Sequence, residues 1–274
     1  MPALQPPPMP PALPPASFGK RRFATTRTTM ALVLREMSTR YGSTPGGYLW
    51  GIVEPLAAIM FLSIGFSLVM KSPSLGTSFL LFYATGYMPF NLYQTLAMTV
   101  SRALMFSKPL LKYPAVTWVD AILARFLLNS LTGILVTALL LTGILVVIDS
   151  RTVLDLVPIT QALGVTILLG LGIGSLNCVL IGLFPLWNIV WGILNRPLFL
   201  ASGVFFLYDT MPPLAQSILW YNPLIHVVGL MRTGFYPTYT AAYINLTYTL
   251  AIALISLTLG LILLGRYHRE IISR

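Results

Sequence analysis

The stretch LREMSTRYGSTPGGYLWGIVEP, residues 34–55, decides the fold because it joins a basic amphipathic segment to an apolar span through a glycine-rich bend. Upstream of the bend, Met30, Leu34, Met37 and Tyr41 recur at helical spacing and form one apolar stripe. A basic amphipathic helix of this kind lies in the interface of a membrane. The chain is therefore expected to lie on a membrane, bend, and enter it.

The polar side of this helix carries Arg35, Glu36 and Arg40, with Glu36 four residues before Arg40 in the favourable order. The two arginines are expected to face lipid headgroups. The glycines and proline within residues 42–47 permit the turn, and Trp50 follows where an interfacial aromatic belongs.

The composition of the 274 residues agrees with a lipid environment. Hydrophobic residues make up 56% and charged residues 9%, and the mean hydropathy is +0.81, whereas a soluble protein carries about 25% charged residues. The net charge of +10 lies mostly in short segments between apolar runs, so it indicates membrane orientation rather than nucleic-acid binding. Cys178 lies in an apolar run and is expected to be a packing residue.

Residues 1–19 form a separate Pro-rich tail without charge, which is expected to be disordered, with a docking peptide as the alternative. Residues 20–274 are expected to form one all-α integral membrane domain. It starts with an interfacial helix and bend at 20–46. Six transmembrane spans follow at residues 48–70, 79–101, 119–148, 156–184, 189–207 and 243–265.

The distribution of positive charge predicts that both termini are cytoplasmic. In that orientation only three cations, Lys71, Arg151 and Arg232, lie on the outer side. Twelve lie on the inner side: Lys20, Arg21, Arg22, Arg27, Arg35, Arg40, Arg102, Lys108, Lys112, Arg266, Arg269 and Arg274.

Residues 208–237 are apolar but interrupted by prolines, and no fragment between them is long enough to cross a bilayer. A re-entrant element at 210–237, made of short helices in the outer leaflet, is one interpretation. Two interfacial helices are the alternative.

Three ionisable residues, Glu54, Arg125 and Arg196, fall at similar depth in the inner third of the bilayer. Because an isolated charge there is costly, we expect Glu54 to pair with Arg125 or Arg196 and to leave one arginine for an anionic headgroup or sugar acid. Snorkelling of the arginines to the surface is the alternative.

The second span is unusually aromatic and polar, with Tyr83, Tyr87 and Tyr93. These rings suit stacking on sugars, and they equally suit interhelical packing. The cytoplasmic segment that follows places Lys108 and Lys112 on one helical face, which indicates either a docking helix or an inert basic loop.

Several kinds of chemistry lack their motifs. The sequence holds no phosphate-binding G-x-x-x-x-G-K-[ST], no H-E-x-x-H and no G-x-S-x-G, and its seven acidic residues are scattered. We therefore expect no nucleotide, metal or cofactor site on this chain, and the sequence gives an enzyme little support.

Three motifs resemble one family. The run across residues 34–55, ILNRPLF at 193–199 and LWYNPLIHVVGLMR at 219–232 are similar to the permease of a type-2 ABC exporter, most of all to capsule-polysaccharide export permeases of the KpsM kind. The resemblance spans residues 23–269. It implies a homodimer in the inner membrane of a Gram-negative bacterium, paired with two ATP-binding subunits that hold ATP and Mg.

The resemblance also implies a cargo and roles for residues. The cargo would be a lipid-linked acidic polysaccharide handed to periplasmic and outer-membrane export proteins. The expected ATPase-coupling residues are Phe106, Lys108, Leu111 and Lys112. The expected outer-gate residues are Pro212, Trp220, Asn222, Pro223, His226 and Arg232. The expected tunnel residues are Arg35, Arg40, Tyr83, Tyr87, Tyr93, Arg125, Trp191 and Arg196.

Other functions stay open at this stage. Within the same class, the alternative cargoes are O-antigen, teichoic acid, another lipid-linked glycan and a drug. From other classes, a multi-pass membrane acyl- or glycosyltransferase and a sensing or structural protein remain alternatives. Co-purification with an ATPase separates the exporter from these.

Overall fold

The computed structural model describes residues 24–41, 47–113, 116–148 and 153–273. The predicted tail at 1–19 lies outside these ranges. The described residues form helices joined by turns, without a strand, which confirms the all-α prediction. The helices are α1 (Ala24–Tyr41), α2 (Trp50–Ser67), α3 (Phe79–Ser101), α4 (Ala103–Ser107), α5 (Trp118–Ile148), α6 (Leu156–Leu183), α7 (Trp187–Leu200), α8 (Pro213–Leu219), α9 (Pro223–Phe235) and α10 (Leu246–Ser273).

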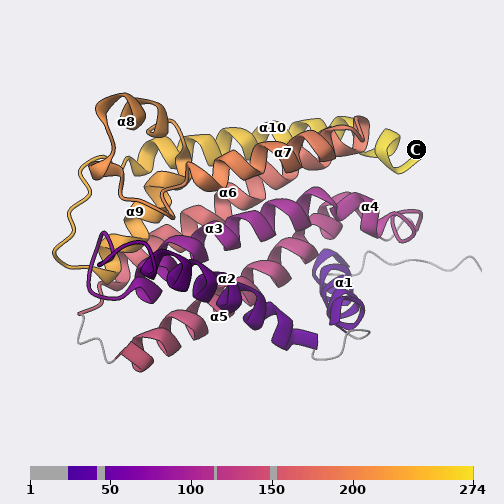
Figure 1. Cartoon of the computed structure of the whole chain (residues 1–274). Coiled ribbons are helices and arrows are strands. Elements are labelled where there is room, and N and C mark those ends of the chain that lie inside the picture. Colours follow the sequence, from indigo (N-terminus) through magenta and orange to yellow (C-terminus); the bar gives the residue numbers. More distant parts are fainter. Residues whose placement is uncertain (1–23, 42–46, 114–115, 149–152, 274) are drawn as a thin grey trace, which may run out of the picture.

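The long helices run lengthwise through one bundle, as Figure 1 shows for α2, α3, α5, α6, α7 and α10. The helix α1 lies across one end of the bundle, at the end where α4 and the C-terminus are found. The helices α8 and α9 lie at the opposite end. The expected cytoplasmic and outer segments are thus separated by the length of the bundle.

Four helices of the described chain are long and apolar enough to cross a membrane, namely α2, α5, α6 and α10. The other two predicted spans correspond to α3 and α7. The 23 residues of α3 include several polar side chains. The 14 residues of α7 extend only about 21 Å at 1.5 Å per residue, short of the bilayer core of about 30 Å. The count of six spans therefore stays a prediction.

Helix boundaries follow local caps. The helix α3 covers the predicted 79–101, and the Ser78 hydroxyl accepts a hydrogen bond from the Leu81 N–H at its start. The prediction for the fifth span, 189–207, was wrong at its end because α7 stops at Leu200. The chain then turns through Gly203, whose φ of 80° lies in the left-handed region that glycine tolerates.

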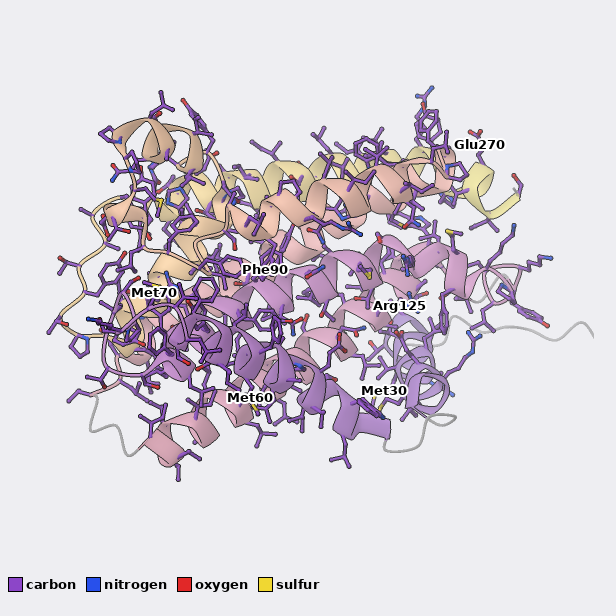
Figure 2. All side chains as sticks on the ribbon, viewed as in Figure 1. Met30, Met60, Met70, Phe90, Arg125 and Glu270 are labelled. Atoms are coloured by element: carbon purple, nitrogen blue, oxygen red, sulfur yellow. The ribbon has the colours of Figure 1, made fainter. Side chains whose placement is uncertain are left out.

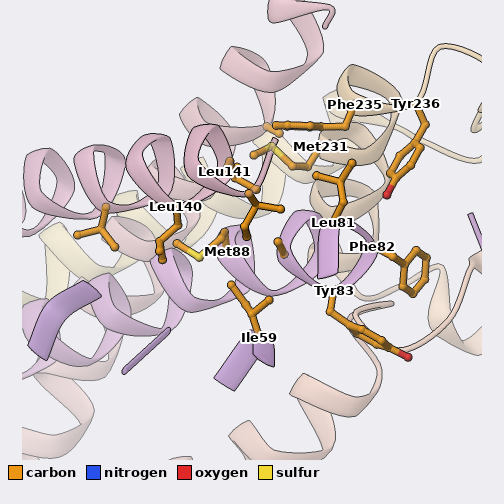
Figure 3. Packing of buried hydrophobic residues seen from close by; sticks show 14 of the residues in the cluster. Ile59, Leu81, Phe82, Tyr83, Met88, Leu140, Leu141, Met231, Phe235 and Tyr236 are labelled. Carbon is orange, nitrogen blue, oxygen red and sulfur yellow. The ribbon is translucent and has the colours of Figure 1, made fainter. Parts of the chain in front are cut away.

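The helix α3 lies at the centre of the bundle, and its side chains are buried on most of its circumference. Toward the outer end, its residues pack with Ile59 of α2, Leu140 of α5 and Met231 of α9. Figure 3 shows these side chains together with Phe82, Tyr83 and Tyr236. The most polar of the predicted spans is therefore the one that contacts protein rather than lipid.

The helices α6 and α10 approach each other closely through glycines. A Cβ built on Gly172 would lie 2.5 Å from the Ala253 carbonyl oxygen. A Cβ on Gly260 would lie 2.8 Å from the Leu176 nitrogen. Small residues that let two backbones approach are a common device of helix packing in membranes.

We expect Gly172→Ala to lower the apparent free energy of unfolding in detergent by about 2 kcal/mol, because its methyl group meets backbone atoms that have no rotamer to change. Gly164→Ala, on the same helix, is the matched control, since its Cβ would meet nothing within 4 Å. Thermal unfolding of both purified variants tests this. Equal midpoints for the two variants would contradict the close α6–α10 approach.

Candidate functional site

The helix α1 is fixed to α5 by an ion pair. The Nε of Arg125 lies 3.3 Å from Oε1 of Glu36, and the two side chains are only 11% and 6% exposed. A second polar contact joins the same two helices: the Thr29 hydroxyl of α1 donates a hydrogen bond to the Asp120 carboxylate of α5 at 3.5 Å. Figure 2 shows Arg125 at the end of the bundle beside α1. The helix α1 is thus anchored to α5 through buried charges.

Arg125 also contacts α3 and α4. Its Nη1 donates to the carbonyl of Thr99 at 3.0 Å, and its guanidinium lies 4.0 Å from the centroid of the Phe106 ring. The guanidinium of Arg35 lies 5.5 Å from the same ring. We call Arg35, Glu36, Phe106 and Arg125 the Arg125 cluster. It joins α1, α3, α4 and α5 at one point.

The structure corrects the expected pairing of Glu54. Glu54 is exposed on α2 and forms no ion pair within the described ranges, while Arg125 pairs with Glu36. Arg196 is exposed on α7 and lines a different cavity. The prediction rested on equal depth in the bilayer, but depth does not say which way a side chain points around its helix.

Glu54 lines a cavity of about 300 Å³ between α2, α3 and α5. The other polar lining residues are Asn91, Thr95, Asn129, Thr132 and Thr137. Because amide and hydroxyl groups line this cavity and it has room for water, the carboxylate can be solvated there without a cation.

We therefore expect Glu54→Gln to change the apparent free energy of unfolding by less than about 1 kcal/mol, because no ion pair is lost. Glu36→Gln is expected to cost about 3 kcal/mol, because it leaves Arg125 buried beside a neutral amide. Denaturation of the two variants in the same detergent gives the comparison. A larger loss for Glu54→Gln than for Glu36→Gln would show that the assignment of the partner is wrong.

A groove of about 300 Å³ lies between α3 and α7. Its polar residues are Tyr87 and Gln94 of α3 and Asn195 and Arg196 of α7. Asn195 is only 8% exposed, and its Oδ1 has no hydrogen-bond partner in the described part of the chain. A buried acceptor of this kind is costly unless water, a ligand or another chain donates to it. The apolar floor includes Phe90 and Phe199, whose ring centroids are 4.7 Å apart.

The structure places two of the predicted tunnel tyrosines elsewhere. Tyr83 is 1% exposed and packs against Phe66, with ring centroids 5.2 Å apart. Tyr93 is 4% exposed and packs against α6. Both are interior packing residues in this chain, since α3 is surrounded by protein. Trp191 is half-buried on α7 and is not among the groove residues. Of the predicted aromatics, Tyr87 alone lines the groove.

The predicted coupling segment contains a helix of five residues, α4, followed by turns to Tyr113. Phe106 is 39% exposed and belongs to the Arg125 cluster. Lys108 is half-buried and Lys112 is exposed. Leu111 packs against a buried cluster that includes Leu104 and Leu264. Of the remaining predicted tunnel cations, Arg35 lies in the cluster, and the side chain of Arg40 lies outside the described residues.

Arg232 holds α9 against α3 and against the segment that follows α7. Its Nη1 donates to the Phe206 carbonyl at 2.9 Å, and its Nη2 donates to the Val204 carbonyl at 3.0 Å. The guanidinium also lies 4.1 Å from the Phe82 ring centroid on α3. Arg232 was predicted to be a cation on the outer side, but it is buried and holds neighbouring segments together through hydrogen bonds.

The other predicted gate residues shape the turn before α9. Asn222 caps α9 by accepting from the Leu224 N–H at 3.0 Å, and its Nδ2 donates to the Ala201 carbonyl at 2.9 Å. Nε2 of His226 lies 2.9 Å from the Trp220 carbonyl, and its Nδ1 accepts from a backbone N–H at 3.3 Å. Pro212 and Pro223 stand at the starts of α8 and α9.

Tyr239, in the loop after α9, is hydrogen-bonded to Asp209, in the segment before α8. Burial raises the pKa of Tyr239, and the neighbouring Tyr243 and Asp209 raise it further. The Tyr239 hydroxyl therefore stays protonated and donates to Oδ2 of Asp209 at 2.9 Å.

Sequence reasoning missed Asp120 and Asn195, and it placed Glu36 on the polar face of α1 without assigning it a partner. Asp120 and Arg125 lie five residues apart in an apolar span, and this could have suggested two contacts to one neighbouring helix. Asn195 precedes Arg196, but its burial depends on where α7 lies against α3. Within the described ranges, no group of three or more His, Cys, Asp or Glu residues could hold a metal ion.

Known proteins resemble this chain over most of its length. Residues 27–236 match the family model of the ABC-2 type transporter. The polysialic acid transport protein KpsM of Escherichia coli is 32% identical over 236 residues, which is 86% of this chain and 92% of the relative.

Two further relatives carry capsule export in their names. The capsule polysaccharide export inner-membrane protein BexB of Haemophilus influenzae is 26% identical and covers 89% of this chain and 92% of its own length. CtrC of Neisseria meningitidis serogroup B, with the same description, is 24% identical, with coverage of 95% and 98%. This chain therefore belongs to the ABC-2 type transporter family and is a homologue of the capsule polysaccharide export permeases.

Proposed function

We propose that this chain is the permease subunit of an ATP-driven exporter that moves a lipid-linked acidic capsular polysaccharide across the inner membrane. The names of its relatives support a capsular cargo. The net charge of +10 and the absence of a phosphate-binding motif support an anionic cargo and an ATPase on a separate chain.

The observation that carries the proposal is the groove between α3 and α7. It combines a cation, Arg196, a buried amide oxygen on Asn195 without a hydrogen-bond partner among the described residues, and the half-buried ring of Tyr87. A sugar acid offers a carboxylate to the first, hydroxyl donors to the second and an apolar ring face to the third. The groove is open along one side of the bundle, as a passage between two copies would require.

The assembly that we propose has two copies of this chain, two ATP-binding subunits that hold ATP and Mg, and periplasmic and outer-membrane export proteins. Both termini of the permease lie in the cytoplasm. The Arg125 cluster lies at the end of the bundle where α1 and α4 meet. A displacement of α1 by the ATPase therefore reaches α5 through the Glu36–Arg125 ion pair, and a displacement of α4 reaches α5 through the contact of Phe106 with Arg125.

Export by groove variants tests this proposal. Arg196→Ala is expected to reduce export about fivefold, because one cation near the membrane surface contributes about 1 kcal/mol toward an anion. Arg196→Lys should keep most of the activity. Lys71→Ala removes an exposed cation outside the groove and serves as the control.

The readout is polysaccharide on the cell surface, normalised to permease in the membrane. Unchanged export by Arg196→Ala, and by Arg196→Ala combined with Asn195→Ala, would remove the groove from the transport path.

A further inference from the structure

A second cavity, of about 790 Å³, lies at the α1 and α4 end of the bundle. It is bordered by α4, the first turns of α5, the end of α6 with the turn to α7, and the end of α10. Its lining includes three cations, Arg102, Lys108 and Arg125, and no acidic residue. Because Arg125 is paired with Glu36, the net positive charge that faces the cavity comes from Arg102 and Lys108.

Arg102 is held at the mouth of this cavity. Its Nη2 donates to Oδ1 of Asn188 at 3.3 Å, which fixes the guanidinium across the turn between α6 and α7. Lys108 is half-buried and makes no salt bridge within the described ranges. Two cations held together in one cavity repel each other, and a bound anion relieves that repulsion.

The remaining wall of the cavity is apolar. Met105, Ile181, Pro185 and Ile271 line it, and Met105 is 59% exposed. Arg102 stands at the C-terminal end of α3, and Ile181 lies in the last turn of α6. The cavity therefore lies where membrane helices end, with charge and an apolar wall side by side.

We propose that this cavity binds the phosphate headgroup of an anionic phospholipid of the inner leaflet. Arg102 and Lys108 contact the phosphate, and the acyl chains lie along Met105 and Ile271. Basic pockets between membrane helices on the cytoplasmic side take such headgroups, and the volume lies within the range of ligand pockets. The ligand is a lipid of the bilayer rather than the cargo, so the inference goes beyond the proposed function.

The cavity lies next to the Arg125 cluster, so a bound lipid would contact residues of that cluster. Phe106 and Arg125 form part of its wall and also belong to the Arg125 cluster. A headgroup in the cavity thus touches the residues that join α1, α4 and α5. Anionic lipid is expected to hold that junction in one arrangement.

Native mass spectrometry of the purified full-length chain tests the inference, with phosphatidylglycerol and phosphatidylethanolamine as the probes. The wild type is expected to retain phosphatidylglycerol preferentially. Arg102→Gln combined with Lys108→Gln should weaken that retention about thirtyfold, since each cation contributes about 1 kcal/mol. Arg266→Gln combined with Arg269→Gln removes two exposed cations at the same end of the bundle and should leave retention unchanged.

Two further arms identify the ligand and guard against misfolding. Met105→Trp keeps all the cations but fills the cavity, so it should also reduce retention. Excess inorganic phosphate should not displace the lipid, and a glycan-linked phospholipid should bind no more tightly than phosphatidylglycerol. Equal retention by the two double variants would overturn the site. Displacement by phosphate, or tighter binding of the glycan-linked lipid, would overturn its assignment to a bilayer lipid.

Discussion

Arg125→Ala is expected to abolish export and to lower the apparent free energy of unfolding by about 3 kcal/mol or more, because it leaves the carboxylate of Glu36 buried without its cation. The same change removes the bond to the Thr99 carbonyl and the contact with Phe106. The hydrogen bond from Thr29 to Asp120 then remains between α1 and α5.

A double-mutant cycle separates the ion pair from general damage. Glu36→Ala and Arg125→Ala together should cost less than the sum of the two single changes, because neither partner is then left buried alone. Arg266→Ala, an exposed cation at the same end, should be neutral. Additive losses in denaturation, with export retained by Arg125→Ala, would show that the ion pair does not couple α1 to α5.

Arg232→Ala is expected to release α8 and α9 from the bundle, with a loss of about 3 to 5 kcal/mol. The side chain is 2% exposed and donates to two carbonyls, at Val204 and Phe206, that no helix satisfies. Arg232→Lys should recover little, because an ammonium cannot reach both carbonyls while it lies flat over Phe82.

Limited proteolysis in membranes measures this release directly, since the segment between α7 and α10 should become accessible to protease. Lys71→Ala, on the same expected side of the membrane, is the control. Protection of that segment in Arg232→Ala at the wild-type level would show that Arg232 is not what holds the outer helices.

Much of the fold could be predicted from the sequence because apolar runs and prolines set the ends of helices. The bounds of α3 and the two short helices after α7 agree with patterns of hydropathy and proline. The end of α7 could not be predicted in this way. The residues after Leu200 are apolar, yet their carbonyls bond to Arg232 from a helix far along the chain.

The candidate site was less predictable, since it depends on how helices face one another. The sequence predicted that Glu54, Arg125 and Arg196 lie at similar depth, but Glu36 was not recognised as the partner of Arg125 because it lies in the expected interfacial helix. Likewise, Tyr83, Tyr87 and Tyr93 look alike in the sequence, and only the packing of α3 against α6 and α7 separates the groove residue from the two interior ones.

The central claim is that this chain transports and a separate ATPase supplies the energy. Purified permease, reconstituted in liposomes with its ATP-binding subunit and lipid-linked polysaccharide, tests it by the amount of glycan that becomes accessible on the far side of the membrane. The account predicts transport that needs both subunits and ATP and that fails with Arg125→Ala. Glycan transfer or movement by the permease alone, without the ATPase, would contradict it.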